Sequence, residues 1–573
     1  MAKIHRVKIS HFRGINSFEE NFYKRGLICL VGRGDSGKST ILEAISDVLT
    51  GKWNINFFDT DFYNSDVDIP IEIEITLTDV PEQLFSEFKY FDYKRAVKLD
   101  GSIIDNFEDG QDDLVGALTI RLVVDKSLDP EWFIICDRHD PKLISSKDRA
   151  LLNVFLISDF SDNHFSWNQG SPLYSLLRKG QITPDDIDKN LLIESFREAK
   201  NKIDQNPFTI FEDTITRVKS STAKLGLDIG EVSTTVDFRD ILVKSNSVCL
   251  HGGDKIPLRL KGKGSKRIIS VGIQQALASD NGIILIDEIE QGLEPDRVKN
   301  LVRAIASNDS NAQVFMSTHS QSAVEELDTD CIYVLKNKDG MVTCTNKNSE
   351  NFQKVYRACA EAIYAKKVIV CEGRTEVGIC RAYDSYRIEN NKNSLSFYNV
   401  VYTDGGGANL VDRALCLSEL GKSVLVICDS DVKEVNDKKQ NLKDAGVEVV
   451  DWGNEANIEA VVFGELPWDA IVELVNYRID SQGRQSFDDT MKNEKLDWDG
   501  KLDSLNNDTG RSILGKVSGL KTIKENGRHD DKSWFKSIKE GEFLGSVIFK
   551  NLNNLSTTSK LKTQISVLTN WVN

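Results

Sequence analysis

Residues 424–431 read Val-Leu-Val-Ile-Cys-Asp-Ser-Asp, so that an apolar run ends directly in two acidic residues. An earlier stretch, residues 368–373, has the same form: Val-Ile-Val-Cys-Glu-Gly. Short apolar runs of this kind predict buried parallel strands. Open α/β sheets place their sites at the carboxyl ends of such strands. The sequence therefore predicts that Glu372, Asp429 and Asp431 converge at one sheet edge, where they would repel each other unless a divalent cation lay between them.

Further carboxylates follow the same elements. Glu376 falls in the first turn of the helix expected after residue 373, and Glu459 follows a further strand predicted at residues 447–452. An acid in a first helical turn is favoured as a cap, which is the alternative interpretation of Glu376. A cap does not account for several acids beside apolar strand ends. The predicted metal ligands are therefore Glu372, Glu376, Asp429 and Asp431, with Glu459 as a weaker candidate.

A nucleotide-binding loop is predicted near the N-terminus. Residues 32–40 fit the pattern G-x-x-x-x-G-K-[ST], after an apolar strand at residues 27–31 and before a helix at residues 41–49. Backbone N–H groups of such a loop hold phosphates, the lysine reaches the β- and γ-phosphates and the serine binds Mg²⁺. The residues predicted to bind ATP and its Mg²⁺ here are Gly32, Gly34, Gly37, Lys38, Ser39 and Thr40.

The partner of this loop comes much later in the chain. Residues 283–288, Ile-Ile-Leu-Ile-Asp-Glu, form a predicted strand that ends in two acids. Asp287 would hold Mg²⁺ through water, and Glu288 would polarise the attacking water. A Gly-Ser loop with Gly264 and Ser265 precedes this strand, and His319 follows another predicted buried strand.

The order of these elements resembles the ABC-type ATPase heads of DNA-repair and chromosome-maintenance proteins. The resemblance implies that Gly264 and Ser265 cap the ATP of a second head and that His319 senses the γ-phosphate. The loop at residues 261–267 departs from the transporter-type Leu-Ser-Gly-Gly, which weakens the roles of its individual residues. The sequence leaves open whether Asp59 or Asp61 serves the family's γ-phosphate and metal-sensing loop or belongs to a solvated turn.

The segments between these motifs are of two kinds. Residues 71–77, 114–124 and 132–136 have strand patterns and are expected to extend the sheet of the head. Residues 184–225 have helical spacing, so a helical insert is expected at about residues 150–235. This insert is either a dimerisation arm or a set of helices packed on their own domain.

Residues 366–460 alternate strands and helices, which indicates a doubly wound unit. Its Glu-Gly and Asp-x-Asp motifs, with a Gly-rich turn at residues 404–409 between them, resemble the Toprim domain. With the ABC-type head upstream, the chain resembles an OLD-family (overcoming lysogenization defect) nuclease over residues 4–320 and 366–460. The family is used in bacterial antiphage defence systems.

The resemblance also implies a catalytic lysine from the C-terminal region. Lys536, beside Trp534 and Phe535, is the first choice and Lys532 the second. The alternative is a solvated lysine near core aromatics. A separate basic cluster could follow DNA phosphates or belong to the ATP site: Lys261, Lys263, Lys266 and Arg267.

Bulk composition sets further limits. A net charge of −16 argues against a strongly basic coat for nucleic acid. The sequence has no run long enough for a membrane span, and its start lacks the apolar core of a signal peptide. The ten cysteines include no Cys-x-x-Cys pair, so a reduced, cytoplasmic protein without a disulfide framework or zinc site is expected.

The expected fold class is α/β: an ABC-type ATPase head with an inserted helical dimerisation segment (residues 1–345), a doubly wound Toprim domain (346–465) and a small C-terminal helical region (466–573). The expected function is an ATP-regulated DNA nuclease that uses Mg²⁺ or Mn²⁺ in a two-metal mechanism. Its expected partners are DNA, further copies of the chain bound through the heads, and a defence-system protein or nucleic-acid element. The alternatives are a non-cutting ATPase scaffold and a topoisomerase- or primase-like enzyme.

Overall fold

A computed structural model describes most of the chain. The described residues are 2–22, 25–86, 89–107, 113–158, 164–165, 171–179, 194–195, 197–198, 201–202, 216, 257–277, 282–307, 312–430, 433–453, 456–494, 498–519, 521–523, 529–531 and 533–573. The chain divides into two compact units. The first contains Met1–Cys29, Gly37–Ser317 and Asn337–Thr343, and the second contains Leu30–Ser36, Thr318–Lys336 and Cys344–Asn573. No helix among the described residues is both long and apolar enough to cross a membrane.

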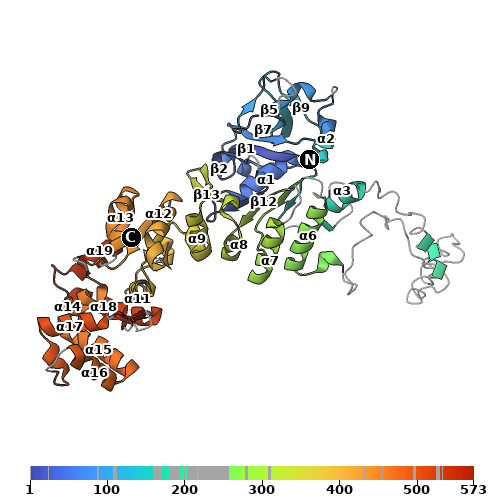
Figure 1. The fold of residues 1–573 in the computed structure, drawn as a ribbon. Helices are drawn as coiled ribbons and strands as arrows, with labels where there is room; N and C mark the ends of the chain where they lie inside the picture. Colours follow the sequence, from blue (N-terminus) through green and yellow to red (C-terminus); the bar gives the residue numbers. More distant parts are fainter. Residues whose placement is uncertain are drawn as a thin grey trace. The chain divides into compact units, whose positions relative to one another are not determined.

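A large mixed sheet is formed mainly by strands of the first unit (Figure 1). Among the described residues it has 14 strands, with the order β10-β11-β12-β3-β13-β14-β2-β1-β4-β7-β5-β6 and with β8 and β9 paired beyond β7. The strands are β1 (Lys3–Phe12), β2 (Ile15–Asn21), β3 (Leu27–Val31), β4 (Ile71–Thr78), β5 (Arg95–Val97), β6 (Ile103–Ile104), β7 (Val115–Val124), β8 (Pro130–Ile135), β9 (Lys142–Leu143), β10 (Leu156–Ile157), β11 (Ile283–Ile286), β12 (Gln313–Thr318), β13 (Ile332–Lys338) and β14 (Met341–Thr345).

Two kinds of pairing divide this sheet. Strands β10, β11 and β12 are parallel, and Ile286 pairs with Met316, so that the residues after β11 lie beside the end of β12. Strands β1, β4, β7 and β8 are antiparallel neighbours. The three segments with strand patterns at residues 71–77, 114–124 and 132–136 are β4, β7 and β8, and they extend the sheet as expected.

The helices of this unit lie along the sheet (Figure 1). They are α1 (Lys38–Leu49), α2 (Ser146–Arg149), α3 (Pro172–Lys179), α6 (Lys263–Leu277) and α7 (Pro295–Ala306). Helix α1 buries Ile41, Ile45 and Val48, whose spacing gives one apolar face. Most of the helical insert expected at residues 150–235, including most of the segment 184–225, lies outside the described residues.

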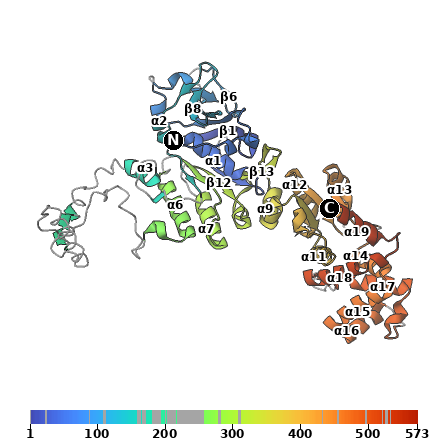
Figure 2. The same ribbon diagram turned by 180° about the vertical axis from the view of Figure 1, so that it is seen from behind.

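The second unit contains a four-stranded parallel sheet with the order β16-β15-β17-β18. Its strands are β15 (Lys367–Cys371), β16 (Val400–Asp404), β17 (Ser423–Ile427) and β18 (Glu448–Val450). Its helices are α8 (Gln321–Glu326), α9 (Glu350–Ala358), α10 (Ala360–Tyr364), α11 (Arg374–Glu389), α12 (Leu410–Glu419), α13 (Lys433–Asp444), α14 (Ile458–Glu465), α15 (Trp468–Gln482), α16 (Arg484–Glu494), α17 (Asp508–Ser518), α18 (Ile538–Lys550) and α19 (Lys560–Val572). Figure 2 shows α14 to α18 grouped together, whereas the C-terminus lies near α12 and α13.

The hydrophobic core of the second unit is continuous. One cluster of buried side chains includes Ile369 and Ile427 on the strands, Phe463 on α14 and Leu544 on α18. The boundary expected at residue 465 therefore does not separate two cores. The C-terminal helices complete the same folded body as the parallel sheet.

Some element ends have a visible backbone cause. Strand β16 begins at Val400, because residues 396–398 form a 3₁₀ turn and Asn399 has a φ of 58°. Helices α9 and α10 are separated at Cys359, whose φ of −139° is not helical. The Gly-Ser segment is also not a loop in this structure, because α6 already begins at Lys263.

Candidate functional site

The nucleotide loop leads directly into helix α1. Gly37 has a φ of 95°, a conformation that favours glycine, and its carbonyl accepts the Ile41 N–H at 2.9 Å to begin the helix. Gly32 also needs to be glycine, because a Cβ there would lie 2.8 Å from the Leu335 carbonyl oxygen. Gly34 is exposed, Thr40 is half-buried in the first turn of α1, and Lys38 is buried. This geometry is that of a phosphate-binding loop at a helix N-terminus.

The acidic pair lies beside this loop. The Ser39 hydroxyl donates to Asp287 Oδ1 at 3.0 Å, so the two residues predicted to bind Mg²⁺ with ATP are in contact. Glu288 has a φ of 49°, a left-handed conformation that is uncommon for a residue with a side chain. Such strain is found at functional sites.

Ser317, which the sequence did not single out, fixes both acids. Its hydroxyl donates to Asp287 Oδ1 at 2.6 Å and accepts the Glu288 N–H at 2.7 Å. The parallel register of β11 and β12 brings it there, because Ser317 follows Met316, the partner of Ile286. Only this register, and no local motif, indicates the role of Ser317.

Arg267 supports the same turn from helix α6. Its side chain is buried, and its guanidinium donates to the carbonyl oxygens of Asp287 at 2.5 Å and Glu288 at 2.6 Å. Of the basic cluster that could follow DNA phosphates, Arg267 is therefore committed to the acidic turn. This favours the ATP-site interpretation for that residue.

The other predicted nucleotide-site residues lie as follows. Gly264 is buried against Gly292, where a Cβ would lie 2.3 Å from the Gly292 carbonyl oxygen, and Ser265 is half-buried in the next position of α6. His319 is exposed in the second unit, and its ring stacks on Tyr364 with 6.1 Å between centroids.

Asp59 and Asp61 differ in their surroundings. Asp59 is exposed, whereas Asp61 is buried and accepts from Arg13 Nε at 2.8 Å and from the Phe58 N–H at 3.0 Å. Asp61 therefore has a structural role in its turn, and of the two only Asp59 remains open to solvent.

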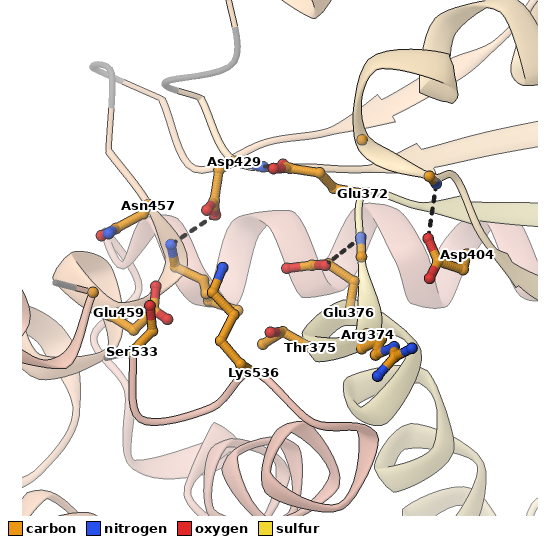
Figure 3. A pocket seen from close by; sticks show the side chains of 15 residues that line it. Glu372, Arg374, Thr375, Glu376, Asp404, Asp429, Asn457, Glu459, Ser533 and Lys536 are labelled. Carbon is orange, nitrogen blue, oxygen red and sulfur yellow. Dashed lines mark hydrogen bonds between the residues drawn. The ribbon is translucent and has the colours of Figure 1, made fainter. Parts of the chain in front are cut away.

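A second candidate site lies at the carboxyl edge of the parallel sheet in the second unit. It is a pocket of about 380 Å³ into which carboxylates from several elements point (Figure 3). The lining residues are Glu372, Gly373, Arg374, Thr375, Glu376, Asp404, Gly406, Gly407, Asp429, Asn457, Ile458, Glu459, Gly519, Ser533 and Lys536. Four of the five predicted metal ligands and the first-choice lysine therefore line one pocket.

Backbone N–H groups orient three of these carboxylates. Glu372 Oε2 accepts from the Asp429 N–H at 2.8 Å, and Asp429 Oδ1 accepts from the Ile458 N–H at 2.9 Å. Glu376 Oε2 accepts from the Gly373 N–H at 2.9 Å, so Glu376 also caps its helix. Glu376 therefore both caps its helix and lines the pocket.

Burial and mutual repulsion make this pocket costly for negative charge. Burial raises the pKa of Asp429 to about 9, and the charges of Glu376, Glu459 and Glu372 add to the rise. Burial also raises the pKa of Glu376 to about 7, with repulsion from Glu372 and Glu459. A group of carboxylates in this state is stabilised by a bound cation.

Lys536 supplies a positive charge to the same pocket. Figure 3 shows its side chain extending toward the space that Asp429, Glu376 and Glu459 surround. It follows Phe535 and Trp534, which are both buried, and these rings anchor the segment as the sequence suggested. Lys532 lies outside the described residues.

Asp404 and Thr375 are among the lining residues that were not predicted as site residues. Asp404 ends β16, the strand beside β15, and its Oδ1 accepts the Gly406 N–H at 2.7 Å. Thr375 lies between Gly373 and Glu376, and its hydroxyl donates to the carbonyl oxygen of Phe535, the residue before Lys536. For Asp404 a signal was present in the sequence, because it too is an acid at the end of a strand.

The donor set fits a divalent cation in chemical type. Carboxylate oxygens are the ligands that Mg²⁺ and Mn²⁺ prefer. Among the described residues, no three His, Cys, Asp or Glu side chains are already close enough together to hold a metal ion. Asp431, the remaining predicted ligand, lies outside the described residues.

Two family models match the N-terminal part of the chain. The model described as "AAA ATPase domain" matches residues 2–119. The model described as "AAA domain, putative AbiEii toxin, Type IV TA system" matches residues 155–325. These ranges contain the nucleotide loop and the acidic pair. This part of the chain is therefore an ATPase domain of the AAA/ABC type.

Two curated proteins are similar to parts of the chain. An "ATP/GTP phosphatase" of Helicobacter pylori is 38% identical over 91 residues, which are 15% of this chain and 23% of that protein. "Retron Vc95 probable ATPase" of Vibrio cholerae is 22% identical over 404 residues, which are 61% of this chain and 77% of that protein. The chain thus spans less than a quarter of the length of the first relative.

Solved structures of Smc head domains were also found. One, from Pyrococcus furiosus and bound to the C-terminal domain of ScpA, is 16% identical with a TM-score of 0.35, and the match covers 62% of this chain and 98% of that chain. Another, from Thermotoga maritima, is 14% identical with a TM-score of 0.28, covering 61% and 100%. At TM-scores this low the likeness carries no argument about fold or assembly.

Proposed function

We propose that this chain, which carries an AAA/ABC-type ATPase domain, is an ATP-regulated, divalent-metal-dependent DNA nuclease of the OLD type. The observation that carries the proposal is the pocket in which Glu372, Glu376, Asp429, Glu459 and Lys536 meet at the carboxyl edge of a parallel sheet. The similarity to a retron ATPase supports a role in bacterial antiphage defence.

In the proposal, Glu372, Glu376, Asp429, Asp431 and Glu459 hold Mg²⁺ or Mn²⁺. Bound there, the metal would lower the pKa of a water and stabilise the leaving oxygen of a phosphodiester. The chain's own backbone prepares this site, because the N–H groups of Gly373, Asp429 and Ile458 fix carboxylate oxygens before any ligand arrives.

Lys536 has a separate task in this reaction. Its ammonium group would pair with the phosphate and stabilise the negative charge that grows on it during attack. In a buried acidic pocket this cation also lowers the repulsion among the carboxylates. The pocket is thereby suited to bind a phosphate beside a metal, despite the overall negative charge of the chain.

The ATPase site would regulate cutting. Lys38 would hold the phosphates, Ser39 and Asp287 would hold Mg²⁺, and Glu288 would orient the attacking water. Hydrolysis of a phosphodiester is downhill, so ATP is proposed to act as a conformational signal. Gly264 and Ser265 would act between the heads of a homodimer or higher oligomer, and His319 would sense the γ-phosphate.

Incubation of the purified protein with DNA tests this function. Supercoiled and linear DNA are each supplied with and without Mg²⁺ or Mn²⁺ and ATP, for the wild type, Asp429→Asn and Asp480→Asn. Asp480 is an exposed acid on α15 outside the pocket, so its variant controls for the charge change.

Metal-dependent cutting by the wild type and Asp480→Asn, lost in Asp429→Asn, is the expected result. Intact plasmid under every condition would overturn the proposal and favour a non-cutting scaffold. Relaxed closed circles would overturn it in favour of a topoisomerase-like reaction.

A further inference from the structure

The segment that carries Lys536 is hydrogen-bonded to the helix that carries Glu376. The Thr375 hydroxyl donates to the Phe535 carbonyl oxygen at 2.7 Å, and Thr375 is only 7% exposed. Each partner is the chain neighbour of a pocket residue, since Thr375 precedes Glu376 and Phe535 precedes Lys536. One buried hydrogen bond therefore joins the two sides of the pocket.

A glycine contact continues this link along the two helices. Gly378 on α11 faces the start of α18, where a Cβ would lie 2.3 Å from the Ile538 carbonyl oxygen and 2.5 Å from the Glu542 nitrogen. Gly541 on α18 faces Thr375, whose carbonyl oxygen would lie 2.4 Å from an added Cβ. Neither residue has a positive φ, so the close approach of backbones, and not the backbone conformation, requires glycine there.

The third glycine of this contact lies one turn further along. A Cβ at Gly545 would lie 2.7 Å from the Ala382 Cβ and 3.1 Å from the Ile379 Cα. The spacing of Gly541 and Gly545 places both on one face of α18. Helices α11 and α18 therefore touch over more than one turn, and their backbones approach too closely for side chains at these positions.

The short segment from Trp534 to Ser537, which leads into α18, is anchored on both sides of Lys536. Trp534 and Phe535 are buried, and the Trp534 N–H donates to the Ser518 carbonyl oxygen at 2.8 Å. Ser537 caps α18, because its hydroxyl accepts the Glu540 N–H at 3.2 Å and its own N–H donates to Glu540 Oε2 at 2.9 Å. Lys536 is the single residue between these two anchors.

We propose that Thr375 and the glycine contact of Gly378, Gly541 and Gly545 form a positioning device that sets Lys536 against the acidic residues of the pocket. This rests on the proposed function of the pocket. Thr375 is a positioning residue: it holds the chain on each side of the reacting groups and need not touch the phosphate. A displacement of about 1 Å in a charged group can cost about 100-fold in rate.

The test uses four variants of the full chain. Thr375→Val keeps the shape but removes the hydroxyl, and Thr375→Ser keeps the hydroxyl. Gly541→Ala adds a Cβ where backbone atoms lie. Gly464→Ala is the matched control, because Gly464 also lies in a helix of the same unit, α14, and an added Cβ there meets nothing within 4 Å.

Three quantities are measured for each variant. They are kcat and KM for DNA cleavage, hydrogen–deuterium exchange of the amides at residues 534–541, and ATP hydrolysis. We expect Thr375→Val and Gly541→Ala to lower kcat by about 10- to 100-fold with little change in KM, and to speed amide exchange in this segment. Thr375→Ser and Gly464→Ala should keep kcat within about threefold of the wild type, which corresponds to less than one hydrogen bond.

Wild-type kcat and wild-type exchange in Thr375→Val would overturn the proposal. A parallel loss of ATP hydrolysis in Thr375→Val would also overturn it, by assigning the hydrogen bond to general stability. If the wild type does not cut DNA, the proposed function fails by itself. The exchange measurement still tests the anchoring in that case, because Thr375→Val, and not Thr375→Ser, should speed amide exchange at residues 534–541.

Discussion

The Ser317→Ala substitution isolates the contact that orders the acidic turn of the ATPase site. Ser317 is fully buried and makes two hydrogen bonds there, one to the Asp287 carboxylate and one from the Glu288 N–H. Alanine removes both and adds no atoms. Any effect therefore comes from the loss of the hydroxyl.

The magnitude follows from these two bonds. A hydrogen bond to a charged group contributes about 1.5–3 kcal/mol, and a buried N–H left without a partner costs about 1–3 kcal/mol. If a water molecule takes the place of the hydroxyl and offsets part of this cost, a loss of about 3 kcal/mol remains. At about 1.4 kcal/mol per tenfold, ATP hydrolysis should fall about 100-fold if this energy holds the acids in place for the reaction.

Ser270→Ala provides a matched control. Ser270 is equally buried, on helix α6, but its hydroxyl has no hydrogen-bond partner among the described residues. Its removal should leave stability unchanged or slightly raised. Steady-state phosphate release and thermal melting are measured for both variants at saturating Mg²⁺ and ATP. Hydrolysis by Ser317→Ala within threefold of the wild type, or an equal loss in Ser270→Ala, would refute the assigned role of Ser317.

Three further outcomes are expected. Lys38→Ala should lower ATP affinity by at least about 100-fold by calorimetry and still allow DNA cutting in at least one nucleotide condition. Loss of cutting in every condition would mean that cutting is coupled to ATP more tightly than a conformational signal requires. Burial raises the pKa of Asp47 to about 7, so ionisation of Asp47 lowers the free energy of unfolding as the pH rises toward that value. The increase in unfolding free energy caused by Asp47→Asn should therefore grow by about 2 kcal/mol from about pH 5.5 to about pH 8.5 in denaturant melts. A pH-independent difference would contradict this. Lys536→Ala should lose DNA cutting while ATP hydrolysis continues, whereas a loss of both would place Lys536 in general stability.

The sequence predicted the local elements well because their signals are local. The glycines of the nucleotide loop, the apolar strands and the acids at their ends follow from short patterns. The structure brings Glu372, Glu376, Asp429 and Glu459 together because β15, β17 and the segment after β18 end at one edge of a parallel sheet.

The contacts that depend on register or helix packing could not be predicted. Ser317 meets Asp287 only through the pairing of β11 with β12, and Thr375 meets Phe535 only through the packing of α11 on α18. The sequence groups Arg267 with a basic cluster, but its buried guanidinium donates to two backbone carbonyl oxygens. A single sequence contains no signal for such long-range partners.

Cation binding by the acidic pocket can be measured directly. Mn²⁺ is titrated by calorimetry into the wild type, a Glu376→Gln/Asp429→Asn double variant and Asp480→Asn, each without nucleotide and with a cleavage-resistant oligonucleotide bound. If the pocket carboxylates hold a cation, the wild type and Asp480→Asn should bind Mn²⁺ and the double variant should not. Equal heats for all three proteins, or no uptake by the wild type, would show that these carboxylates are not a metal site.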